Sequence, residues 1–277
     1  MENKKNRCIE YAILSIFIFT FLFTGCEKDD DPKAPDLPPL ATFVMDFTDF
    51  GGDQLKHMVL PSTLKSSDVS TAVNWGWAAS NVLVWNTVLF VNLAVPVASF
   101  YEAFNHEGVY QGDNEWIWAY NFMGGTYKAE LHGTLTTTQV EWEMYISKED
   151  VYTDFLWYSG TSNLTLTEGQ WLLNGNPDNP YPYLQIDWTR SADDESADIK
   201  YKNVISGNDY YDSYISYGRT NETTFDLFYD IYNSLSQNLI NIEWNQTTKE
   251  GRIKDSEHFG DELWHCWDAS LQDTVCD

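Results

Sequence analysis

The tightest group of side chains able to hold a metal ion lies near the C-terminus. His258, Asp261, Glu262 and His265 bring two imidazoles and two carboxylates into one short stretch. Imidazole nitrogens and carboxylate oxygens are ligands that zinc uses, so a turn that gathered them would form a metal site. An exposed polar segment that leads into the last strand explains the same residues equally well. The metal site is therefore one of two predictions for this segment.

Acidic residues also suit glycoside hydrolysis, because two carboxylates about 5 to 10 Å apart can perform that reaction. The candidate carboxylates are numerous: Asp187, Asp193, Asp194, Glu195, Asp226, Asp230 and Glu243. The run 193–195 also fits a solvated hairpin turn that loosely holds Ca²⁺. The chain has neither a Gly-x-Ser-x-Gly elbow nor a Gly-rich loop leading into Lys-Ser/Thr, the usual parts of acyl transfer and nucleotide chemistry. We therefore expect no catalytic residues and no cofactor other than such a cation, with glycan hydrolysis as the alternative.

The N-terminus predicts export and lipidation. A positive start precedes an apolar run over 11–23, which has the length of a signal-peptide core. The run ends in Phe-Thr-Gly-Cys at 23–26. This ending resembles the lipobox of bacterial lipoproteins, which implies removal of a signal peptide at 1–25 and a diacylglyceryl group on Cys26. The alternative is an uncleaved N-terminal helix with a chance cysteine.

The residues after Cys26 predict the cellular location of the protein. Glu-Lys-Asp-Asp-Asp at 27–31 resembles the acidic export signal of Bacteroidetes-type surface lipoproteins, which implies a lipid-anchored protein of the outer membrane, at the cell surface. A merely solvated tether is the alternative. Four prolines follow, so we expect 26–40 to form a semi-rigid tether and 41–277 a single β-rich domain.

Charge and cysteines narrow the partners and the compartment. Sixteen basic against 42 acidic residues give a net charge of −26, which repels phosphate backbones and excludes nucleic acid as a partner. The expected partners are the membrane, through Cys26, and a lipid, glycan or envelope protein. In an oxidising compartment Cys266 and Cys276 would form a disulfide, worth roughly 2 to 3 kcal/mol, rather than two free thiols.

The domain itself predicts a mostly β fold, a large antiparallel meander sheet or half-barrel of about ten to twelve strands. Short alternating runs are separated by turn residues, and Phe43, Met45 and Phe47 alternate as a first strand would. The runs are 116–120, 127–135, 139–146, 154–158, 163–173, 183–189, 198–205, 213–217, 225–232, 239–245, 251–255 and 262–267.

One segment departs from the β pattern. Residues 78–104 are apolar almost all round, as in a helix buried in protein or in lipid. Three asparagines and Pro96 favour a core helix wrapped by the sheet over a membrane span. On this helix Asn81, Asn92 and Ser99 fall in one stripe, which predicts a polar lining for a ligand pocket.

A curved sheet around an apolar helix resembles the periplasmic lipoprotein carriers of the LolA and LolB kind. The resemblance concerns architecture over most of the mature chain and implies an acyl-binding concavity, with no residue to carry over. Aromatic residues near loops could form a binding rim: Tyr181, Tyr183, Tyr210, Tyr211 and Tyr214. We therefore expect a non-enzymatic binding protein for a hydrophobic ligand, a glycan or an envelope partner. A structural or assembly component of the envelope is the alternative, beside the glycan hydrolase.

Overall fold

The computed structural model describes residues 32–45, 47, 50, 72–191, 198–220 and 222–276. A compact unit runs from Ala34 to Asp277, and Met1–Lys33 forms a separate unit. The boundary expected at residue 41 thus falls inside the compact unit. The predicted signal peptide, Cys26 and the acidic run behind it lie outside the described residues.

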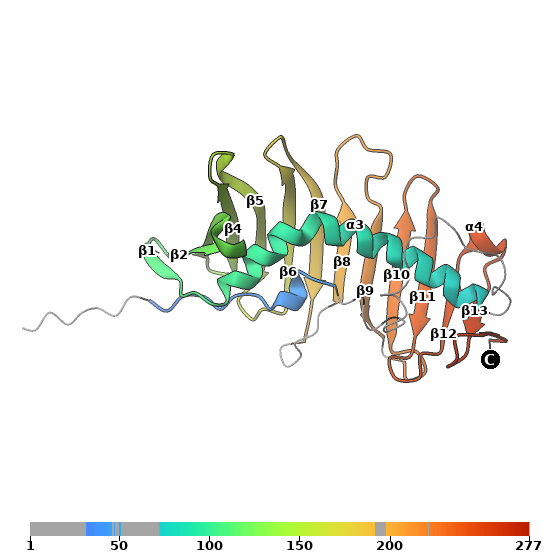
Figure 1. Ribbon diagram of the computed structural model, residues 1–277. Coiled ribbons are helices and arrows are strands. Elements are labelled where there is room, and N and C mark those ends of the chain that lie inside the picture. Colours follow the sequence, from blue (N-terminus) through green and yellow to red (C-terminus); the bar gives the residue numbers. More distant parts are fainter. Residues whose placement is uncertain are drawn as a thin grey trace, which may run out of the picture. The chain divides into compact units, whose positions relative to one another are not determined.

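The compact unit is built on one open antiparallel sheet of 14 strands, paired in sequence order from β1 to β14 (Figure 1). This confirms the predicted mostly β meander, with two more strands than the highest number expected. The additions are the edge strands, which are too short to show alternation. The strands are β1 Val109–Gly112, β2 Glu115–Phe122, β3 Tyr127–Leu135, β4 Gln139–Lys148, β5 Tyr152–Asn163, β6 Glu168–Asn176, β7 Asn179–Thr189, β8 Asp198–Asn203, β9 Tyr214–Arg219, β10 Leu227–Asn233, β11 Asn238–Trp244, β12 Gly251–Lys254, β13 His265–Trp267 and β14 Asp273–Thr274.

Tryptophan and glycine alternate across the inner face of the first half of this sheet. In one row of paired residues, Trp116, Gly133, Trp142, Gly160 and Trp171 follow one another from β2 to β6. The three indoles are buried. A β-carbon on Gly160 would lie 2.3 Å from Cε3 of Trp171, and one on Gly133 would lie 2.7 Å from Cζ3 of Trp142. The indoles of Trp142 and Trp171 therefore occupy the space that the neighbouring strand leaves by having no side chain.

A single long helix, α3 (Val73–Ala103), crosses this inner face from one end of the sheet to the other (Figure 1). A helix of that length extends about 46 Å, long enough to pass over most of the strands. Asn74 Nδ2 donates to the carbonyl oxygen of Cys266 in β13 at 2.9 Å. Near the other end, the Tyr120 hydroxyl of β2 donates to the carbonyl oxygen of Ser99 at 2.7 Å. The predicted helix inside a half-barrel is confirmed, and it begins at Val73, five residues before the expected start.

The helix is covered on one side only. By length and composition it could cross a membrane, and 28% of its most apolar window is buried. Leu89, Leu93 and Phe100 are buried, whereas Phe90 and Val91 are 77% and 70% exposed. A helix that is apolar all round but packs on one face leaves an apolar surface toward its surroundings.

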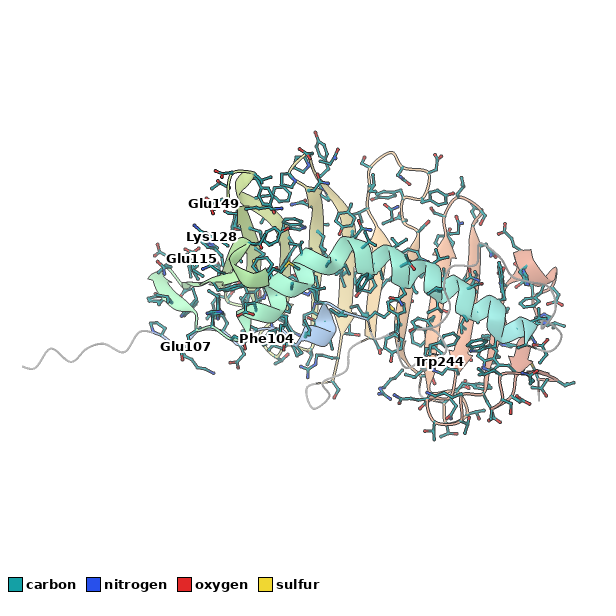
Figure 2. All side chains as sticks on the ribbon, in the orientation of Figure 1. Phe104, Glu107, Glu115, Lys128, Glu149 and Trp244 are labelled. Atoms are coloured by element: carbon teal, nitrogen blue, oxygen red, sulfur yellow. A yellow bond between two sulfur atoms is a disulfide. The ribbon has the colours of Figure 1, made fainter. Side chains whose placement is uncertain are left out.

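The segment before α3 runs along the inner face beside the helix, and we call it the strap: residues 34–45 with Phe47 and Phe50. The prediction of a first strand here is wrong, because Leu40–Thr42 is a 3₁₀ helix, η1, and the strap pairs with no described strand. Its rings enter the core instead. Phe43 packs on Phe100 and Trp171 at centroid distances of 5.4 and 5.5 Å, and Phe50 meets Trp244 at 4.9 Å, at the far end of the sheet (Figure 2).

The C-terminal end of the sheet is closed by a covalent link. Cys266 and Cys276 form a disulfide with an S–S distance of 2.04 Å. It ties β13 to the chain beyond β14, and the short helix α4 (Ser256–Phe259) precedes β13 in the sequence. The link stabilises an edge whose last strand has only two residues.

The glycine row makes a testable prediction. Gly160→Ala should lower the free energy of unfolding by about 1 to 3 kcal/mol, because the new methyl group overlaps the Trp171 ring and the Gln170 carbonyl oxygen, 2.5 Å away. Gly76→Ala is the matched control. It lies in α3 with open space around it and should stabilise the protein by up to about 1 kcal/mol. Urea denaturation measures both, and equal effects would contradict the role assigned to the row.

Candidate functional site

An apolar groove lies between the strap and α3. Its walls are Val44, Met45 and Phe47 on one side and the helix on the other, and Tyr201 of β8 also lines it. Its volume is about 480 Å³, within the usual range for small-molecule sites. The helix contributes Asn86, Leu89, Phe90, Leu93, Ala94, Val97, Ala98 and Tyr101.

The side chains of the groove suit a hydrophobic ligand. Asn86 is the one amide among the lining residues, and none of them carries a charge. Ala94 and Ala98 are small, so the helix wall stays open where a larger residue would fill the space. A ligand that buries this apolar surface is stabilised by roughly 25 cal/mol per Å² of area removed from water.

Tyr201 fixes the strap to the sheet. Its buried hydroxyl donates to the carbonyl oxygen of Phe43 at 3.0 Å and accepts from the backbone N–H of Met45 at 2.8 Å. Burial raises the pKa of Tyr201 well above the usual tyrosine range, so the hydroxyl stays neutral and keeps both bonds. Tyr201 therefore holds the groove wall in place together with the packing of Phe43.

The three predicted pocket residues on the helix do not form one pocket. Asn81 and Asn92 each donate to their own helix, to the carbonyl oxygens of Trp77 and Val88 at 2.9 and 2.7 Å. Ser99 donates to the carbonyl oxygen of Pro96 at 2.7 Å. The stripe lies at the border of the buried face, where its surroundings change: Asn81 lines a hollow, Asn92 is exposed and Ser99 is buried.

The predicted metal cluster is only partly brought together. His265 Nε2 lies 3.1 Å from Oδ1 of Asp261, whereas the ring of His258 stacks on Trp77 at 3.9 Å. The Leu263 N–H and then His265 lower the pKa of Asp261. Glu262 is exposed. Across the part of the chain that the structure describes, no three histidine, cysteine or acidic residues are arranged to hold an ion.

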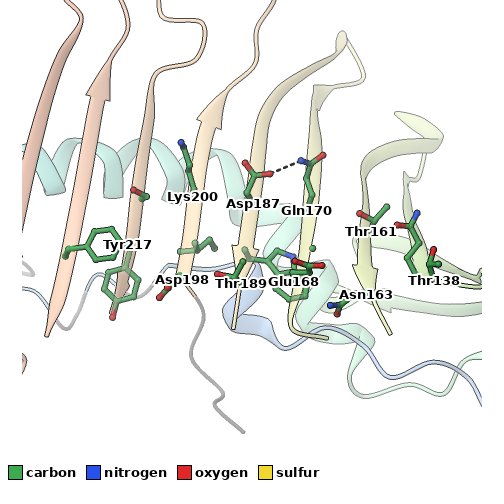
Figure 3. A pocket seen from close by; sticks show the side chains of 16 residues that line it. Thr138, Thr161, Asn163, Glu168, Gln170, Asp187, Thr189, Asp198, Lys200 and Tyr217 are labelled. Atoms are coloured by element: carbon green, nitrogen blue, oxygen red, sulfur yellow. Dashed lines mark hydrogen bonds between the residues drawn. The ribbon is translucent and has the colours of Figure 1, made fainter. Parts of the chain in front are cut away.

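The candidate carboxylates lie on strands or in turns and are bonded to neighbours. Asp187 Oδ1 accepts from Gln170 Nε2 at 2.7 Å, in a polar hollow of about 670 Å³ that Figure 3 shows. Asp230 Oδ1 accepts from Asn241 Nδ2, and Asp226 Oδ1 accepts from the Gln246 N–H. Glu243 pairs with Arg252. Residues 193–195 lie outside the described residues.

The predicted tyrosine rim is dispersed. Tyr183 donates to the carbonyl oxygen of Asn92 at 3.4 Å, and Tyr214 lies under the ammonium group of Lys200, 3.6 Å from its ring centroid. Tyr181 is exposed. Tyr210 lines the same hollow as Asn81, whereas its neighbour Tyr211 does not.

No protein-family model, curated protein or solved structure matches this chain. The groove therefore has to be judged on its own geometry. The sequence predicted an acyl-binding concavity but not the residues that line this groove, because its walls come from distant segments. The sequence signal that could have located the groove is that α3 carries more apolar residues than packing on one sheet requires.

The tyrosine anchor makes a second prediction. Tyr201→Phe should lower the free energy of unfolding by about 1 to 3 kcal/mol and speed hydrogen exchange at the Met45 amide, because that buried N–H loses its acceptor. Tyr110→Phe is a control, since its hydroxyl makes no hydrogen bond within the described chain. Unchanged exchange at Met45 would show that ring packing alone holds the strap.

Proposed function

We propose that this protein is an extracytoplasmic lipoprotein, anchored in the outer membrane through Cys26, that binds a hydrophobic ligand with an acyl chain. The observation that carries the proposal is the uncharged groove between the strap and α3. The ligand lies along the helix, with its chain against Leu93, Val97 and Ala98. No chemical step is involved.

The exposed side of α3 supports binding rather than a purely structural role. Phe90, at the mouth of the groove, is 77% exposed. Leaving a large ring in water forgoes its burial, worth about 1.5 to 3 kcal/mol. A ligand that covers Phe90 recovers this free energy.

The anchor supports a lipid as the ligand. Between Cys26 and Ala34 the extended chain reaches at most about 30 Å. A domain tethered to a bilayer by so short a chain meets acyl chains at high effective concentration.

Blocking the groove tests the proposal. Ala94→Trp places an indole in the groove and should weaken binding of a fluorescent long-chain fatty acid at least about tenfold. Val91→Trp is the matched control, since Val91 is exposed on the same helix outside the groove. Both variants are made in Cys26→Ser protein, so that its own acyl chains do not compete. Absence of saturable binding, or equal loss in both variants, contradicts the proposal.

The anchor has its own test. Cys26→Ala should abolish incorporation of labelled palmitate, because the thiol that would take the diacylglyceryl group is gone. Replacing Asp29, Asp30 and Asp31 with asparagine should keep the label but remove the protein from the reach of added protease on intact cells. Palmitate label on Cys26→Ala protein would show that another residue is lipidated.

A further inference from the structure

A second hollow lies on the opposite side of α3 from the groove. It has a volume of about 490 Å³, and Trp77, Asn81 and Trp85 of the helix line it together with the β10–β11 hairpin, Tyr210 and α4. At about 100° per residue, these helix positions point away from Phe90, Ala94 and Tyr101 of the groove. The two hollows are therefore separate sites on one helix.

One wall of this hollow is held in place by a buried carboxylate. Asp255, 1% exposed, accepts from Trp77 Nε1 and from Asn238 Nδ2, each at 2.8 Å. The backbone N–H groups of Glu257 and His258 also donate to it, at 3.2 Å. His258 stacks on the Trp77 ring at an interplanar angle of 9°. The indole of Trp77 thus has a fixed position before any ligand arrives, which reduces the entropy lost on binding.

Other polar groups of the hollow are available to a ligand. Within the described residues, no hydrogen bond is made by Trp85 Nε1, by the Tyr210 hydroxyl or by Oδ1 of Asn81. Asn233 and Ser236 lie on the hairpin side of the hollow. Aromatic rings and hydrogen-bonding groups therefore line the same hollow.

This combination selects a class of ligand. Aromatic rings pack on apolar C–H faces, whereas amides and hydroxyls bind hydroxyl groups, and a sugar ring presents both. The lining contains no lysine or arginine, and Glu257 contributes a carboxylate, so an anionic sugar is disfavoured. A quaternary ammonium group would use the aromatic rings but leave the amide and hydroxyl groups unpaired.

We propose that the hollow formed by Trp77, Trp85, Tyr210 and Asn81 binds a neutral oligosaccharide. The sugar stacks on Trp85 and Tyr210 and hydrogen-bonds to Asn81. This site is independent of the acyl-binding groove, so each proposal can fail without the other.

Titration with oligosaccharides tests the site. Full-length protein carrying Cys26→Ser is screened against immobilised neutral oligosaccharides of glucose, mannose, galactose, xylose and N-acetylglucosamine, and the retained ones are measured by calorimetry. Trp85→Ala and Tyr210→Ala should each weaken binding at least about tenfold. Tyr211→Ala is the matched control, because Tyr211 is 46% exposed against 47% for Tyr210 but lies outside the hollow. Ala94→Trp, which blocks the groove, should leave sugar binding unchanged.

Three results overturn the proposal. These are retention of none of the neutral oligosaccharides, equal loss with Tyr211→Ala, and displacement of the sugar by choline at the same site. Circular dichroism of each variant shows whether it is folded. If Trp85→Ala does not fold, Tyr210→Ala alone decides, since its side chain is half exposed and carries little of the core.

Discussion

The structure depends on covering one face of a wide sheet that does not close on itself. An open sheet of 14 strands presents an apolar inner face far larger than its own side chains can bury. In a closed barrel the opposite wall would cover that face. Here α3 and the strap cover that face. The helix runs across the strands and not along them (Figure 1). Crossing lets one helix reach strands from β2 to β13 and ties both ends of the sheet together.

The tryptophan–glycine row adapts the sheet to this cover. Indoles of full size on every strand would lift α3 off the sheet. Placing glycine opposite each of Trp142 and Trp171 lets the rings lie over the neighbouring strands. Phe43 of the strap and Phe100 of the helix stack on each other above this surface, and both contact Trp171.

Much of this arrangement could be predicted from the sequence, and the limits have physical causes. Period-two alternation marks the strands from β2 to β13, because each side chain's face is set locally. The edge strands β1 and β14 were not predicted, because strands of four and two residues at the ends of the sheet show too little alternation. The run predicted as one strand over 163–173 contains a turn, with β6 beginning at Glu168. The strap alternates like a strand, yet its hydrogen bonds go to a turn and to Tyr201, a partner more than 150 residues away.

The candidate site was less predictable than the fold because it depends on which sides of α3 remain uncovered. The predicted stripe does lie on one side of the helix, where Asn81, Asn92 and Ser99 project in the same direction. The sequence does not say which part of the protein faces each of these residues. The loops beside β10 and β11 form a hollow that Asn81 lines, whereas Ser99 is buried against the sheet. The same uncertainty applies to apolar residues: Leu93 and Phe90 are equivalent by sequence, yet Leu93 is buried and Phe90 is exposed. A helix that must bury one side and line a groove with another has to be apolar nearly all round, which is why its composition also resembles that of a membrane span.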